Sequence, residues 1–218
     1  MPLTHGTVSG RIYRVTDTLP NAFKEQFERN LARHAFKPID PERGQLEAIG
    51  WVNIRQMLDS RLTLNKVLFG NLILVGLRID KLTINQKLFR ATLMQEIGRV
   101  MKEKDKRNLS KEERLVIEDK VRLELIKRTQ PNTAVHEMAW HLEEGVVFFG
   151  TTGERMNMAF SDLFTETFQV GIEPQYPYLR AQRWAEKQGL GQDLLELLPS
   201  PFSPDAPVEV VEIGSEAE

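Results

Sequence analysis

The sequence predicts an α+β fold: an antiparallel sheet with packed helices and an inserted long helical hairpin arm. Three observations lead to this prediction. The segments follow the order strand, helix, strand, strand, helical hairpin, strand, strand, helix, which is typical of α+β proteins. Two strand-like segments, 133–142 and 146–149, are joined by a turn short enough for a β-hairpin. Two charged segments between residues 81 and 130 have helical periodicity and are joined by a short turn.

The chain begins with a predicted strand and a predicted helix. Residues 6–15 are rich in β-branched and aromatic residues, which favours a strand. A helix opens at Pro20 and ends before Pro38, because the residue preceding a proline avoids the helical region. The apolar stripe of this helix repeats every four residues and consists of Phe23, Phe27, Leu31 and Ala35.

Further elements surround the helical hairpin. Strands are predicted at 44–54 and 72–79, and the second is almost continuously apolar, which predicts burial on both faces. The β-hairpin follows the charged segment. A helix is predicted from about Glu154, and a short one near 178–188. The stripe of the first of these two helices contains Met156, Phe160, Phe164 and Phe168.

The helical hairpin consists of two helices around residue 109. The first has an apolar stripe, and the stretch 108–110 interrupts it. Ser110 followed three residues later by Glu113 predicts a capping box, so the second helix starts there and runs to about Lys127. The stripes are Phe89, Leu93, Ile97, Val100 and Met101 in the first helix, and Ile117, Val121 and Leu125 in the second.

The chain therefore divides into three predicted parts. Residues 1–80 and 131–184 form a discontinuous α+β body, residues 81–130 the arm, and residues 185–218 an acidic, proline-rich tail expected to be disordered. The net charge of −2 hides an asymmetry, because the tail holds eight acids and one base. Residues 1–184 carry 28 basic and 23 acidic residues, a balance of +5, which suits a polyanion-binding surface.

The arm carries the candidate binding residues. Eleven basic residues face seven acids between Arg99 and Arg128, and basic clusters without a base-reading pattern suit contact with phosphates. Long exposed helices are also rich in lysine and glutamate for solubility alone, so charge does not decide between a phosphate-binding surface and a merely solvated one. The candidate DNA-binding residues are Arg78, Lys81, Arg99, Lys102, Lys104, Lys106, Arg107, Lys111, Arg114, Lys127 and Arg128.

Motifs for catalysis or metal binding are not found in the sequence. His136 and His141 are five apart on a predicted strand, so they point to opposite faces and cannot share a metal. No nucleophile elbow, Walker loop or dinucleotide-binding glycine motif occurs. The triplet 118–120 contains Glu118 and Asp119, but adjacent helical positions point about 100° apart and do not converge on one ion. We expect no enzyme activity, no catalytic residue, no metal site and no cofactor.

The composition indicates the cellular location in which the protein is expected. The chain has no cysteine, which makes a reducing, cytoplasmic location the expectation. No stretch is long and apolar enough to span a bilayer, and no secretory signal opens the sequence, so no membrane association is expected.

The order and spacing of several short motifs resemble the family of the bacterial recombination-associated protein RdgC, over roughly residues 8–170. The motifs are Ile12-Tyr13-Arg14-Val15, Phe27-Glu28 with Leu31-Ala32, Ala35-Phe36-Lys37-Pro38, Gly50-Trp51-Val52, Leu109-Ser110-Lys111-Glu112-Glu113, Val121 with Leu123-Glu124-Leu125-Ile126, Trp140, and Val146-Val147-Phe148-Phe149 after the turn at Gly145.

The resemblance implies a function. Proteins of the RdgC family are non-enzymatic and bind DNA without sequence preference, as a ring-shaped homodimer around the duplex, and they restrain strand exchange by the RecA recombinase. The resemblance therefore implies that double-stranded DNA is a partner and that single-stranded DNA is a further possible partner. It also implies a homodimer, a link to a RecA-type recombinase and a nucleoid-associated location.

The chain departs from the family pattern at three places. It carries an acidic tail where family members continue with further basic positions. The stretch 125–131 lacks the aromatic residue that the family has after the second arm helix, and Asn53-Ile54-Arg55 replaces prolines. These departures indicate a shortened or divergent member.

Two other functions remain open on the sequence. One is a protein-interaction module that has lost DNA binding and contacts a partner through the arm or the acidic tail. The other is a nuclease, for which the carboxylates of the arm would have to bind magnesium.

Overall fold

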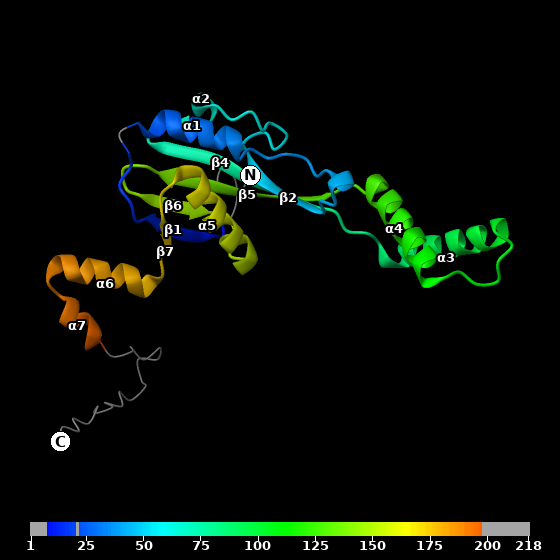
Figure 1. Cartoon of the computed structure of the whole chain (residues 1–218). Helices are drawn as coiled ribbons and strands as arrows, with labels where there is room; N and C mark the ends of the chain where they lie inside the picture. Colours follow the sequence, from blue (N-terminus) through cyan, green and yellow to red (C-terminus); the bar gives the residue numbers. More distant parts are fainter. Residues whose placement is uncertain (1–7, 21, 198–218) are drawn as a thin grey trace, which may run out of the picture. The chain divides into compact units, whose positions relative to one another are not determined.

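The computed structural model describes residues 8–20 and 22–197 (Figure 1). The chain divides into two compact units, one up to Pro174 and one from Gln175 onward. The first unit holds the sheet and most of the helices. The second unit holds two short helices.

The first unit is built on one antiparallel sheet, which together with its helices confirms the predicted α+β class. The strands follow the order β2-β4-β5-β6-β1-β7, and the short β3 pairs with β4. The longest ladder joins β4 to β5 over ten residue pairs, from Leu72 opposite His141 to Lys81 opposite Asn132. The strands are β1 (Arg11–Val15), β2 (Glu47–Asn53), β3 (Leu68–Phe69), β4 (Leu72–Lys81), β5 (Asn132–His141), β6 (Val146–Phe149) and β7 (Ile172–Pro174).

Helices of the described chain follow the predicted order, with short additions that the sequence did not reveal. The short 3₁₀ helix Pro41–Arg43 and the helix α2 were not predicted. The α-helices of the first unit are α1 (Phe23–Arg33), α2 (Leu64–Val67), α3 (Gln86–Glu103), α4 (Lys111–Arg128) and α5 (Glu154–Phe168). Those of the second unit are α6 (Pro177–Gln188) and α7 (Gly191–Leu195).

The predicted first helix was too long at both ends. It starts at Phe23, whose amide donates to the carbonyl of Pro20 in a preceding turn. It ends at Arg33, so Ala35 does not continue the apolar stripe. The backbone there pairs with β2 instead: the Trp51 amide donates to His34, and the Phe36 amide donates to Trp51. The two hydrogen bonds to a neighbouring strand replace those that a further helical turn would make.

Aromatic side chains form the core between the sheet and the helices α1 and α5. Phe27 of α1 and Phe160, Phe164 and Phe168 of α5 are fully buried with Trp140 of the sheet. The rings of Phe149 and Phe160 stack with centroids 4.0 Å apart. Full burial of each such side chain stabilises the fold by about 1.5–3 kcal/mol. The stripes predicted at Phe23, Phe27 and Leu31 and along α5 therefore mark the core correctly.

Helices α3 and α4, which we call the helical pair, follow β4 and precede β5 and have a core of their own. Phe89, Leu109, Ile117 and Val121 are buried between them. The helices run antiparallel: Lys120 of α4 contacts Glu96 of α3, whereas Lys104 after the end of α3 contacts Glu113 in the first turn of α4. That the pair extends from the sheet as an arm stays a prediction.

The predicted tail begins inside α6. Residues 191–195 form α7, so the described part of the segment 185–218 is largely helical. Gly189 ends α6 with φ +74°, a conformation that glycine adopts without steric cost. The segment from residue 198 onward lies outside the described residues.

Candidate nucleic-acid interface

The predicted capping box starts α4 and fixes the turn of the helical pair. Ser110 Oγ accepts a hydrogen bond from the Glu113 amide at 3.2 Å, and Glu113 Oε2 accepts one from the Ser110 amide at 3.1 Å. Two of the amides at the start of the helix are thereby satisfied. The capping box therefore fixes where the turn ends and α4 begins.

Glu113 also binds two of the candidate lysines. Its Oε1 lies 2.8 Å from Lys104 Nζ and 3.0 Å from Lys106 Nζ. The hydrogen bonds from Lys104, from the Ser110 amide and from Lys106 lower the pKa of Glu113 to about 2. One carboxylate thus neutralises part of the charge of two lysines at neutral pH.

Four further candidate cations lie at the same turn, exposed to solvent and with no ion pair among the described residues. They are Lys102, Arg107, Lys111 and Arg114. Counted from residue 99 to 114, seven basic residues face four acids. We call these four residues, together with Lys104 and Lys106, the turn cluster. Exposed guanidinium and ammonium groups without a carboxylate partner are available to phosphate oxygens.

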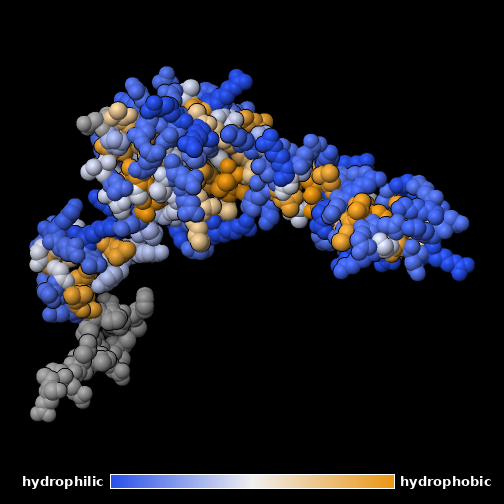
Figure 2. Space-filling view, in the orientation of Figure 1, coloured by the Kyte–Doolittle hydropathy of each residue, from blue (hydrophilic) through white to orange (hydrophobic). Residues whose placement is uncertain are grey.

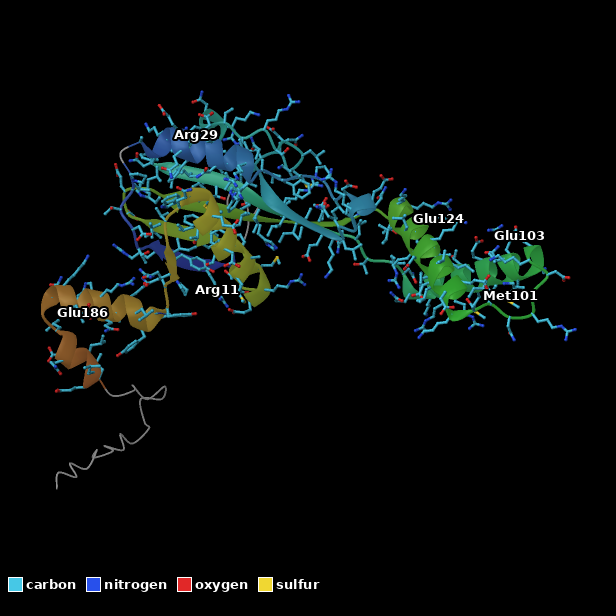
Figure 3. All side chains as sticks on the ribbon, in the orientation of Figure 1. Arg11, Arg29, Met101, Glu103, Glu124 and Glu186 are labelled. Atoms are coloured by element: carbon cyan, nitrogen blue, oxygen red, sulfur yellow. The ribbon has the colours of Figure 1, made fainter. Side chains whose placement is uncertain are left out.

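The middle of the helical pair is neutralised by its own ion pairs. Arg99 binds Glu96 at 2.6 Å and also binds Glu103, while Lys120 reaches Glu96 from α4 at 3.2 Å. Hydrogen bonds from Arg99 and Lys120 lower the pKa of Glu96 to about 2. Arg99, unlike Lys102, Arg107, Lys111 and Arg114, therefore has its charge neutralised by neighbouring carboxylates. Figure 3 shows charged side chains along both helices, with Glu103 at the turn end of α3 and Glu124 on α4.

A second group of cations lies at the opposite end of the helical pair, near the sheet. Lys127 is paired with Glu42 at 2.8 Å, but Lys81 and Arg128 are exposed without an ion pair among the described residues. Lys87 and Arg90 in the first two turns of α3 are exposed in the same way, and sequence reasoning missed them. Counting charge over the whole hairpin, rather than from Arg99, would have found them.

Arg78 has a different environment from the other candidates. Its guanidinium donates two hydrogen bonds to Asp80, at 2.8 and 2.7 Å, and lies 4.2 Å from the ring centroid of Phe36. Its side chain is only 13% exposed. Burial alone would raise the pKa of Asp80, but hydrogen bonds from Arg78 and Thr133 outweigh it and lower that pKa. This arginine is therefore part of an internal ion pair on β4.

Among the described residues, His34 Nδ1 lies 3.8 Å from Glu166 Oε2, but the histidines and carboxylates do not gather into a larger cluster. His136 packs its ring edge-on against Phe149, and burial lowers its pKa. His141 Nδ1 accepts a hydrogen bond from the Glu144 amide. Glu118 binds Arg122, whereas Lys120 two positions later binds Glu96. Among the described residues, no group of three or more candidate ligands could hold a metal ion.

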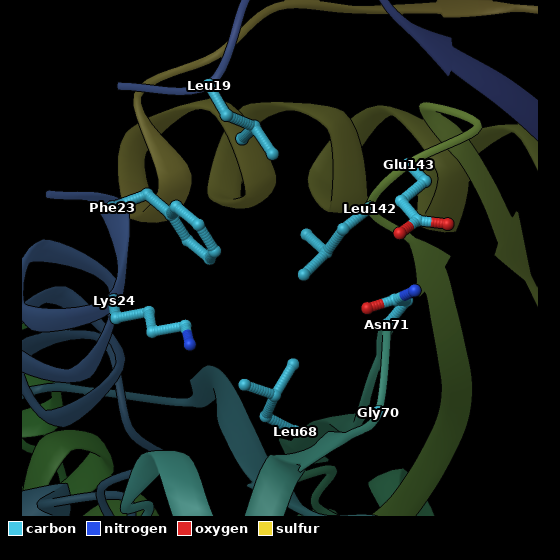
Figure 4. Close-up of a pocket in the computed structure, with 8 residues that line it drawn as sticks. All are labelled: Leu19, Phe23, Lys24, Leu68, Gly70, Asn71, Leu142 and Glu143. Atoms are coloured by element: carbon cyan, nitrogen blue, oxygen red, sulfur yellow. The ribbon is translucent and has the colours of Figure 1, made fainter. Parts of the chain in front are cut away.

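One pocket of about 370 Å³ opens between α1 and the strand ends (Figure 4). Its apolar lining comes from Leu19, Phe23, Leu68 and Leu142. Lys24 and Glu143 stand at its edge. Neither belongs to the helical pair, so the pocket is separate from the turn cluster.

Comparison with protein families matches the chain to the family described as "Putative exonuclease, RdgC", over residues 9–177. The match includes the whole sheet and the helical pair. The chain belongs to the RdgC family. Membership in the RdgC family supports a recombination-related role and agrees with the resemblance carried by the short motifs. The matched region ends at the first residue of α6, so nearly all of the second unit lies outside it.

Among curated proteins, this RdgC-family chain has no match. None of its described helices combines the length and the apolar character needed to cross a membrane.

Proposed function

We propose that this RdgC-family protein binds double-stranded DNA without sequence preference, through phosphate contacts made by the turn cluster. The observation that carries the proposal is the set of four exposed cations that form no ion pair within the described part of the chain, Lys102, Arg107, Lys111 and Arg114, next to two lysines that share one carboxylate. Phosphate contacts of this kind give affinity that falls steeply with salt and carries no sequence information.

The surface of the helical pair supports this proposal. Figure 2 shows mostly hydrophilic atoms over α3 and α4. Exposed apolar side chains such as Leu115 and Val116 are present, yet the stretch 102–114 around the turn contains no aromatic residue that could stack on a base. The surface around the turn therefore consists mainly of groups that bind the phosphate backbone of DNA and do not recognise bases.

The proposal includes the wider family role. We propose that the protein acts without catalysis, as a homodimer that modulates a RecA-type recombinase by occupying the duplex. Lys81, Lys87, Arg90 and Arg128 at the other end of the helical pair would add phosphate contacts. Arg78 is left out of the proposed interface, because Asp80 and Phe36 hold its guanidinium.

The test compares two triple variants with the same change in net charge. The first, Arg107→Gln with Lys111→Gln and Arg114→Gln, removes three cations of the turn cluster. The second removes three exposed cations on and after α1: Arg29→Gln, Arg33→Gln and Lys37→Gln. Fluorescence anisotropy with random-sequence duplexes is measured from low to physiological salt. We expect only the first variant to lose affinity and to flatten the slope of log affinity against log salt, by up to about three.

Equal losses in both variants would show a mere effect of net charge and contradict the proposed interface. Because the family description names an exonuclease, the same samples are incubated with labelled DNA and Mg²⁺. Degradation that a single carboxylate substitution abolishes would replace the non-catalytic proposal. A folded wild type that binds no duplex at low salt would favour a protein-interaction module instead.

A further inference from the structure

The second unit carries an exposed tryptophan in a basic setting. Trp184 on α6 is 61% exposed, whereas the other two tryptophans, Trp51 and Trp140, are fully buried. Burial of an exposed indole against a ligand would recover free energy, and its flat ring with one polar N–H suits stacking contacts. The tryptophan lies outside the region matched to the RdgC family.

Two cations share the helical face of this tryptophan. Arg180, Trp184 and Lys187 are spaced i, i+4 and i+7, which places them along one side of α6. Arg180 and Lys187 are exposed, and neither has an ion pair among the described residues. The acid of this helix lies elsewhere: Glu186 accepts a hydrogen bond from Gln182, two positions from Trp184 and therefore about 160° around the helix.

We infer that this face of α6 is a second nucleic-acid site, which binds single-stranded DNA by stacking a base on Trp184 while Arg180 and Lys187 contact the flanking phosphates. Stacking platforms flanked by cations are how proteins bind single strands without sequence preference. The inference rests on the proposed function only in that both ligands are DNA. It concerns another unit, another strand state and another kind of contact.

A protein partner fits this face less well. Docking surfaces on helices carry apolar anchors at i, i+3, i+4 and i+7. Here the neighbours of Trp184 along the same face are two cations, the small Ala181 and the polar Gln188, and the exposed Tyr178 lies about 120° around the helix from it. A single aromatic ring between two cations matches a base between two phosphates.

The test uses the tryptophan as its own probe. The full chain is titrated with single-stranded oligo(dT) while tryptophan emission is recorded. Since only Trp184 is exposed, stacking should quench the water-exposed part of the emission, and added salt should reverse it. Trp184→Phe should remove this signal but keep binding, as measured by anisotropy, because phenylalanine still stacks.

Affinity for the single strand decides between stacking and charge. Trp184→Ala should weaken oligo(dT) binding about fivefold or more, whereas Tyr178→Ala, which removes an exposed aromatic from another side of α6, should leave it unchanged. The triple turn-cluster variant should keep the Trp184 quenching, which separates this site from the proposed duplex interface. Unchanged emission at saturating oligo(dT), or wild-type affinity of Trp184→Ala, would overturn the inference.

Discussion

Single polar residues hold α5 to the sheet from inside the core. Thr167 Oγ1 of α5 accepts a hydrogen bond from Trp51 Nε1 of β2 at 2.8 Å, and it donates one to the Leu163 carbonyl. Near the other end of α5, Tyr13 Oη of β1 donates to Asn157 Oδ1 at 2.6 Å. Both contacts satisfy buried groups and fix where along the sheet the helix lies.

Thr167→Val tests the first of these contacts. Valine keeps the shape but cannot accept the indole N–H, so a buried donor is left unpaired. We expect the free energy of unfolding to fall by about 1–3 kcal/mol. Urea denaturation measures the change. Thr165→Val, an exposed position on the same helix, is the control and should change stability by less than about 0.5 kcal/mol. Equal effects would mean that helix propensity, not the hydrogen bond, matters.

The role of a single residue could be predicted where it depends on neighbours close in the sequence. Phe27, Phe160 and Phe164 were assigned to the core because helical spacing puts them on one side. The sequence analysis predicts Arg78 as a DNA contact, although Asp80 two residues along the same strand shares its face. The stacking of Arg78 on Phe36 involves residues 42 positions apart, and no periodicity reveals such a pair.

At the scale of elements, the turn of the helical pair is organised around Glu113. Glu113→Gln keeps the capping box, because glutamine serves at this position too. It removes a negative charge and releases Lys104 and Lys106. We expect tighter duplex binding and a steeper salt dependence, measured by anisotropy at several salt concentrations. Glu124→Gln removes the same charge from an exposed position of α4 with no ion pair among the described residues, and should increase affinity less.

The pKa of Glu113 adds a pH dependence to this element. Its value in the folded protein, about 2, lies below the ordinary 4.5. A lowered pKa contributes stability above pH 4.5, and this contribution is lost as the pH falls from 4.5 towards 2. The stability of Glu113→Gln should therefore depend less on pH in that window. A wild-type pH profile in the variant would contradict the ion-pair arrangement.

Helix ends were predictable only where their cause was nearby in the chain. Ser110 and Glu113 lie within four residues of each other and predict the start of α4. The structure shows both hydrogen bonds of the capping box between them. The end of α1 before Ala35 depends on pairing with Trp51, sixteen residues away, and the stripe gave no sign of it. Likewise, the two-residue strand β3 exists only through its pairing with β4.

At the scale of the whole molecule, charge is distributed unevenly along the chain. Residues 198–218 contain five acids and no base. Removal of this segment should tighten duplex binding, most at low salt, because it eliminates a competitor and a repulsive charge. Anisotropy on a chain ending at Leu197 measures the effect. In the triple turn-cluster variant the same deletion should increase duplex affinity by a smaller factor. Unchanged affinity of the shortened chain would exclude the acidic segment as a competitor.

The ion pairs in the middle of the helical pair set a length scale for the proposed duplex interface. Each helix has 18 residues and is about 27 Å long. Considering the described residues alone, the cations without an ion pair lie at the two ends of the pair, with a neutralised stretch between them. Along B-form DNA, in which base pairs are about 3.4 Å apart, this separation corresponds to about eight base pairs. In the proposed binding mode a duplex much shorter than that would reach only one end and a longer one would bridge both, so we expect affinity to rise with duplex length up to about eight base pairs.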